Sequence, residues 1–257
     1  MKDLKSKVPA LERGLDILAL LEKNPAGLNF SGLLSGLKIP KPSLSRILLV
    51  LQQNRYIRQE DRVYKLGFKL LSLGTSVQNG FSLSKVARPH LEELLKETDE
   101  TVELSILDND CILTIDKLES FVSPIRLFSR LGGFFENVHS FAHGKVALAF
   151  IGEERAEKWI NEHGLVKVTP FTITSATALK KELLRIRSGG YGSDFQEARL
   201  EVSRVAAPIF GTDKKLEGMV DVAGPFFRMN RKTKSKYAAA VKKCAGNISK
   251  ELGYEKY

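Results

Sequence analysis

Residues 29–66 constrain the fold of this chain most, because they combine a helix, a break, a second helix and a hairpin in that order. Asn29 is a residue type that caps helix N-termini, and an apolar stripe follows it. The residues of that stripe are Phe30, Leu33, Leu34 and Leu37. Pro40 ends the first helix, since proline cannot continue a helix and restricts the residue before it. A second helix is expected over 41–53, with Pro42 tolerated in its first turn. This order predicts a winged helix-turn-helix.

The second helix and the hairpin carry the candidate DNA contacts. Leucine and isoleucine at spacings of three and four turn one face of the helix inward and leave a polar face. The polar residues suited to phosphates and base edges are Lys41, Ser43, Ser45 and Arg46. Short hydroxyls and cations near a helix N-terminus are typical of major-groove contacts. The hairpin turns at Glu60-Asp61, and its cations Arg58 and Arg62 are placed to straddle a DNA backbone.

The pattern alone leaves a second interpretation open, because winged helices also serve as protein-binding modules. Charge favours nucleic acid: residues 1–67 hold 12 Lys and Arg against 6 Asp and Glu. Residues 68–227 hold 19 basic and 22 acidic side chains, and residues 228–257 hold 9 and 2. The basic end fits either a solvated helix face or a contact with DNA or a partner. We therefore expect one module that binds double-stranded DNA, joined to something else.

The rest of the composition indicates a cytoplasmic protein. The charged start of the chain has no apolar segment behind it, so no secretory signal is visible. No apolar run is long enough to cross a bilayer, so no membrane contact is expected. Cys111 and Cys244 are far apart and lack metal-ligand spacing, which fits a reducing compartment. With 257 residues the chain can form one or two domains with a sizeable core.

Periodicity predicts an α+β fold with a largely antiparallel sheet behind the first module. In the first helix, 9–23, one helical face is expected to be marked by Leu11, Leu15, Leu18 and Leu21 and widened by Ile17 and Leu20. Later helices are expected at 83–96, 142–151, 153–161, 179–188 and 235–252. Strands are expected at 102–106, 111–117, 125–128, 202–209 and 216–223. The predicted domains are a winged helix-turn-helix at 1–67, a linker helix at 68–80 and a second domain at 81–257.

Several phrases, in order over most of the chain, resemble the IclR family of bacterial transcriptional regulators. In the first part they are ALERGLDILALLE, IPKPSLSRILLVL and YKLGFKLLSLG. In the second part they are VARPHLEELLKETDETVELSILDND, HSFAHGKVALAF, LKKELLRIRSGGYGSD, VAAPIF and VDVAGP. The resemblance implies a GAF-like effector-binding domain and dimers or tetramers on palindromic operators. It also implies control by a small organic-acid or sugar-acid effector. Lys38 stands where the family usually has a turn glycine, so no known operator sequence transfers.

The resemblance also implies an effector pocket in the second domain. Its residues by position are Phe128, Leu131, Ala142, His143, Asp194, Arg204, Asp221 and Ala223. Amides at the helix start near Ala142 and His143 suit a carboxylate. Arg204 stands where the family often has Cys. It would either bind an anionic effector in a bidentate pair or pair internally with Asp221 or Asp194 and fill the pocket.

No catalytic residues, metal site or cofactor are expected. His139 and His143 have i,i+4 spacing, but only one of them is expected within the helix and no third ligand is evident. No nucleophile with a base and no phosphate loop is marked by local context. Two alternatives stay open beside an effector-controlled regulator. One is a small-molecule-binding enzyme whose first domain mediates assembly, and the other is a constitutive DNA-binding protein with a degenerate sensor.

Overall fold

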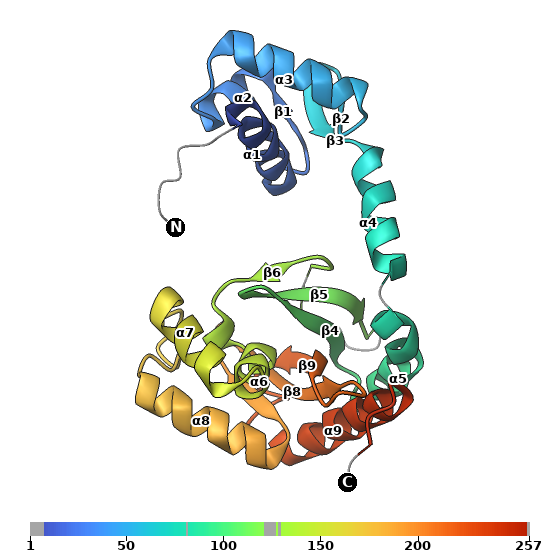
Figure 1. Cartoon of the computed structure of the whole chain (residues 1–257), viewed down its shortest axis with the longest axis vertical. Coiled ribbons are helices and arrows are strands. Elements are labelled where there is room, and N and C mark those ends of the chain that lie inside the picture. Colours follow the sequence, from blue (N-terminus) through green and yellow to red (C-terminus); the bar gives the residue numbers. More distant parts are fainter. Residues whose placement is uncertain (1–7, 81, 121–126, 128–129, 256–257) are drawn as a thin grey trace. The chain divides into compact units, whose positions relative to one another are not determined.

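The structure, a computed structural model, describes residues 8–80, 82–120, 127 and 130–255. The chain forms two compact units, Met1–Gly80 and Phe81–Tyr257. Figure 1 shows the elements of each unit.

The first unit is a winged helix-turn-helix. Its helices are α1 (Pro9–Lys23), α2 (Phe30–Gly36), α3 (Lys41–Gln53) and α4 (Phe68–Gly80). The side chain of Asn29 accepts a hydrogen bond from the amide of Gly32 at 2.8 Å and caps α2. Pro40 is the N-cap residue of α3, with φ of −60°. The predicted start and end of α3 are therefore confirmed.

Three short strands complete this unit. They are β1 (Leu28–Asn29), β2 (Ile57–Glu60) and β3 (Val63–Leu66), in the order β1-β3-β2. The β2–β3 turn places Asp61 and Arg62 at φ of 48° and 62°, which suits the twist of a two-residue hairpin. The sequence did not indicate β1, which is only two residues long. Gly27, which directly precedes β1, lies so close to β3 that a Cβ on it would be 2.6 Å from the Tyr64 carbonyl oxygen.

One expectation for α1 was wrong. Leu11 and Leu15 were expected in the core, yet their side chains are 60% and 57% exposed. The buried residues of α1 are Gly14, Ile17 and Leu21. Apolar residues surround most of this helix, so periodicity could not show which side packs. Gly14 lies near Ile47 of α3, and the packed side of α1 is centred on Ile17 and Leu21 rather than on Leu11 and Leu15.

The second unit is built on one antiparallel sheet, as predicted. Its strands run β6-β5-β4-β9-β8-β7 across the sheet. Their bounds are β4 Thr101–Asp108, β5 Cys111–Leu118, β6 Phe134–Phe135, β7 Gly192–Phe195, β8 Val202–Phe210 and β9 Leu216–Pro225. The strand expected at 125–128 falls mostly outside the described residues, and Leu127 has no regular structure.

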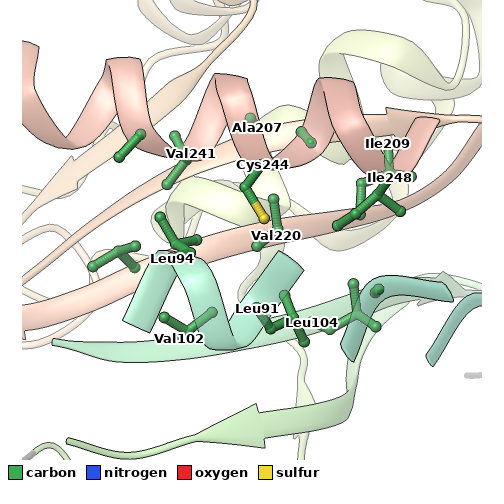
Figure 2. Packing of buried hydrophobic residues seen from close by; sticks show 14 of the residues in the cluster. Leu91, Leu94, Val102, Leu104, Ala207, Ile209, Val220, Val241, Cys244 and Ile248 are labelled. Carbon is green, nitrogen blue, oxygen red and sulfur yellow. The ribbon is translucent and has the colours of Figure 1, made fainter. Parts of the chain in front are cut away.

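Helices cover both faces of this sheet (Figure 1). On one face lie α5 (Ser82–Thr98) and α9 (Lys234–Glu251). Over the other lie the short 3-10 helix Val138–Ser140, α6 (Ala142–Phe150), α7 (Glu153–His163) and α8 (Ala176–Gly189). Figure 2 shows the first apolar layer, where Leu91 of α5, Val220 of β9 and Cys244 of α9 pack together. Burial raises the pKa of Cys244 to about 12, so this thiol acts as a core residue.

Each unit has a separate apolar core. The first unit buries Ile17, Leu33, Leu44, Leu48 and Ile57. The second unit has a layer on each face of its sheet. Within the described part of the chain, no helix has the length and apolar character needed to cross a membrane.

Candidate functional site

The face of α3 away from the core carries most of the predicted DNA contacts. Lys41, Ser45 and Arg46 are exposed, whereas Ser43 is half-buried. Leu44 and Leu48 are fully buried and fix the rotation of the helix. The structure therefore presents three of the four predicted side chains to solvent from one rigid helix, which is the arrangement that base reading requires.

Two apolar residues share the exposed surface of α3. Leu49 and Val50 are 56% and 55% exposed. Sequence reasoning did not select them, although their offset from the inward positions Leu44 and Leu48 was visible. Exposed aliphatic groups on such a helix can contact thymine methyl groups or another protein surface.

The two predicted arginines of the wing differ in their surroundings. The Arg58 guanidinium pairs with Glu60 and lies 5.0 Å from the ring centroid of Phe68. Glu60 also accepts from Lys65 at 3.2 Å. Arg62, by contrast, is exposed in the turn. Arg62 is thus the better placed of the two predicted arginines to meet a phosphate.

In the second unit, strand pairing gathers charged side chains on the sheet face beneath α6. Glu103 of β4 stands directly opposite Asp221 of β9. On the next strand, β8, Arg204 is paired with Ala223 of β9 on one side and with Asp194 of β7 on the other. Glu103, Asp221 and Asp194 are fully buried, and Arg204 is 6% exposed. Burial of so many charges away from water requires close compensation between them.

Arg204 lies between carboxylates and aromatic rings. Its Nε is 3.7 Å from Oε2 of Glu103 and 3.7 Å from Oδ2 of Asp221. Its guanidinium carbon lies 5.4 Å from the ring centroid of Phe141 and 6.0 Å from that of Phe135. Burial opposes its charge, but the acids Glu103, Asp221 and Asp194 together raise the pKa of Arg204. The internal pair with Asp221 is thus present, and sequence reasoning missed Glu103.

His143 completes the cluster from the first turn of α6. Its Nδ1 is 3.4 Å from Oδ1 of Asp221, and its ring stacks on Phe141 at 5.3 Å between centroids. The amides of Ala142, His143 and Gly144 precede the first hydrogen bond within the helix, which Lys145 donates to Phe141 at 2.9 Å. This turn thus carries backbone donors that precede the hydrogen bonds within the helix, and its imidazole lies beside Asp221.

A second buried ion pair lies next to this cluster. Lys145 of α6 is fully buried and donates to both carboxylate oxygens of Glu197, at 2.6 and 2.7 Å. Asp194 Oδ1 accepts from the Glu197 amide at 2.7 Å and so shapes the turn that carries Glu197. Burial, opposed by Lys145, raises the pKa of Glu197 to about 7. Sequence reasoning did not identify either member of this pair.

The remaining predicted pocket residues have different positions. Ala142 and Ala223 are fully buried, at the start of α6 and beside Arg204. Leu131, expected as a wall, is 52% exposed in a turn. Phe128 lies outside the described residues. The rings of Phe135 and Phe141 form an aromatic wall that sequence reasoning did not identify.

The chain matches known proteins over nearly its whole length. The family described as Bacterial transcriptional regulator IclR C-terminal matches residues 75–250, and the IclR helix-turn-helix domain matches residues 10–61. The chain is 31% identical over 219 residues to the HTH-type transcriptional regulator KdgR of Dickeya chrysanthemi, covering 84% of this chain and 71% of that protein.

Solved structures show the same architecture. The crystal structure of the Thermotoga maritima IclR has a TM-score of 0.80 at 30% identity, covering 96% of this chain and 100% of that chain. An IclR homolog from Microbacterium hydrocarbonoxydans, complexed with 4-hydroxybenzoate, has a TM-score of 0.81 at 21% identity. That alignment covers 95% of this chain and 99% of the homolog. At 21% identity the likeness concerns the fold alone.

Proposed function

The chain belongs to the IclR family of bacterial transcriptional regulators, and on that premise we propose that it binds operator DNA sequence-specifically under control of a small effector. The observation that carries the proposal is the exposed face of α3, where Lys41, Ser45 and Arg46 project from a helix whose core face is fixed. The basic charge of residues 1–67 supplies the long-range attraction to DNA. Such a regulator acts in the cytoplasm and needs no catalytic group.

In this proposal α3 enters the major groove. Arg46 reads a base edge, and Lys41 and Ser45 bind phosphates or base edges near the start of the helix. The half-buried Ser43 contributes through its hydroxyl, and Leu49 contacts a thymine methyl group. Arg62 at the tip of the wing binds the backbone, while Arg58 is held by Glu60 and contributes less.

The regulator acts as a homodimer or a homotetramer. Support comes from apolar surface on the first unit. A groove of about 590 Å³ lies between α1 and α3, lined by the exposed Leu11, Leu15 and Val50 among others. On α4, Phe68 and Leu71 are 71% and 68% exposed. Contiguous apolar surface of this kind marks a protein interface, and a symmetric pair of α3 helices fits a palindromic operator.

The effector site is the buried cluster beneath α6, and the effector is a small carboxylate. The amides at the start of α6 are suited to a carboxylate, and the rings of Phe135 and Phe141 suit the apolar part of a small organic acid. The Microbacterium homolog, which has the same fold, was crystallised in complex with 4-hydroxybenzoate, an aromatic carboxylate. Arg204 is shared between Glu103 and Asp221, so it would pair with the effector only after leaving them.

That same pairing favours a second candidate function, a constitutive DNA-binding protein with a filled sensor. The two functions differ in calorimetry with simple organic acids on wild type and on Arg204→Ala. An effector-controlled regulator gives heat that changes with the variant, whereas a filled sensor gives no heat with any acid in either protein.

Selection of genomic DNA fragments tests the main proposal. The full chain should enrich a small set of fragments with a two-fold symmetric site, and an effective acid should change its affinity for them at least tenfold. Residues 81–257 alone, which have their own core, should bind the acid but enrich no DNA. Absence of enrichment by the full chain would contradict the proposal, and turnover of a substrate by residues 81–257 would favour an enzyme.

A further inference from the structure

Three buried side chains in the second unit bring metal-ligand atoms together. Glu103 of β4, His143 of α6 and Asp221 of β9 each offer one ligand atom, and these atoms lie within 4.8 Å of one another. All three residues are 0% exposed. The two carboxylates face each other across directly paired strands, and the imidazole comes from the helix above. Rigid elements therefore hold all three groups.

The polar atoms of this trio lack hydrogen-bond partners. Both carboxylate oxygens of Glu103, both of Asp221 and both ring nitrogens of His143 are buried without a partner among the described residues. The nearest charge contacts, at 3.4 to 3.7 Å, are too long for good hydrogen bonds. Buried polar atoms without partners are costly, so this density of them on facing residues points to a bound species.

The charge balance says which species fits. Three acidic side chains, Glu103, Asp221 and Asp194, share this buried region, whereas Arg204 is the one Lys or Arg side chain within 4 Å of the Glu103 and Asp221 carboxyl groups among the described residues. Lys145 is matched by Glu197. Acidic side chains therefore outnumber basic ones at this site, which favours a bound cation over a bound anion.

We propose that Glu103, His143 and Asp221 bind a divalent transition-metal ion such as Zn²⁺ or Mn²⁺. The imidazole favours a transition metal over Mg²⁺ or Ca²⁺, which prefer oxygen ligands throughout. Bonds of about 2.0 to 2.2 Å need only small inward movements of side chains whose ligand atoms already lie within 4.8 Å. Arg204 holds the outer carboxylate oxygens and orients the ligands.

Three protein ligands leave at least one coordination position open. An effector carboxylate can take that position, and this step alone rests on the proposed function. The metal ion would supply the positive charge that the anion otherwise lacks. Metal binding itself requires neither DNA nor effector, so its test is separate from that of the regulator.

Calorimetry on the full chain, stripped with EDTA and dialysed, tests the site with ZnCl₂ and MnCl₂ as probes. We expect one ion per chain, confirmed by elemental analysis after gel filtration. Glu103→Gln, His143→Gln and Asp221→Asn should each weaken binding at least tenfold. His139→Gln and His163→Gln are matched controls. His139 is a buried imidazole outside the trio, and His163 is an imidazole near Asp110. Both controls should bind as wild type does.

A spectroscopic measurement on the wild type identifies the metal ligands even if the ligand variants fail to fold. X-ray absorption on the zinc-loaded wild type should show one imidazole with oxygen donors at about 2.0 to 2.1 Å. Substoichiometric binding, unchanged affinity in the three ligand variants, or a zinc environment without imidazole would each overturn the proposal. Loss of metal binding with intact DNA binding would leave the proposed regulator standing.

Discussion

Glu197 shows how one buried residue links this fold to pH. Its carboxylate is held by the fully buried Lys145, yet burial raises its pKa from the ordinary 4.5 to about 7. Asp194 and Glu182 contribute in the same direction. An acid whose pKa is raised on folding stabilises the native state fully below its unfolded pKa. That stabilisation is lost as the pH rises through about 7.

The resulting prediction is a stability that falls as the pH rises from about 4.5 to about 7. Glu197 should contribute about 3 kcal/mol to this fall, because folding raises its pKa from 4.5 to about 7. Glu197→Gln removes the titrating group and leaves Lys145 unpaired, so the slope should flatten or reverse. Urea unfolding of the second unit at several pH values, with EDTA present, measures it. An unchanged slope in the variant would show that Glu197 does not titrate in this range.

Gly144 sets how closely α6 approaches the segment before it. A Cβ at this position would lie 2.0 Å from the carbonyl oxygen of Val138, so the backbone would have to move. Gly144→Ala should destabilise the second unit by about 1–3 kcal/mol or more through overpacking. Gly246→Ala is the matched control, because nothing lies within 4 Å of its Cβ position in α9 and alanine should add up to about 1 kcal/mol. Thermal unfolding of both variants compares them, and equal melting temperatures would contradict the predicted clash.

At the scale of elements, local signals placed the helix-turn-helix and long-range packing decided the rest. Asn29 and Pro40 mark helix starts through their own chemistry, so α2 and α3 were predictable. The exact buried side of α1 was not, because its apolar residues lie on more than one side of the helix and only packing against the rest of the unit buries Ile17 and exposes Leu11 and Leu15. The short β1 exists only through its pairing with β3.

The wing yields a prediction that separates its two arginines. Arg62 is exposed at the turn, whereas Arg58 is already paired with Glu60. Arg62→Ala should weaken DNA binding and reduce the slope of log affinity against log salt by about 1 per contact. Arg58→Ala should reduce the slope less. Fluorescence anisotropy on a selected fragment at several salt concentrations tests this, and equal slopes for both variants would remove the distinction.

At the scale of the whole molecule, two units with separate cores divide the proposed tasks. The family and the positions of Arg204, Asp221 and His143 could be read from sequence phrases. The role of Glu103 could not, because only the pairing of β4 with β9 brings it opposite Asp221. The aromatic wall of Phe135 and Phe141 could not be predicted for the same reason. The segments that meet around these rings are far apart in the sequence, and no local motif indicates their contact.

The most direct test of sequence-specific DNA binding is the affinity of Arg46→Ala for a fragment selected by the wild type. Lys23→Ala is the control, since it removes one exposed positive charge from the same unit, in the last turn of α1 rather than on α3. In gel-shift titrations at one stated salt concentration, Arg46→Ala should lose at least tenfold in affinity, about 1.4 kcal/mol or more. Its circular dichroism should stay that of wild type, and Lys23→Ala should bind nearly as wild type does. Wild-type affinity in a folded Arg46→Ala would contradict the assignment of α3 as the helix that reads DNA.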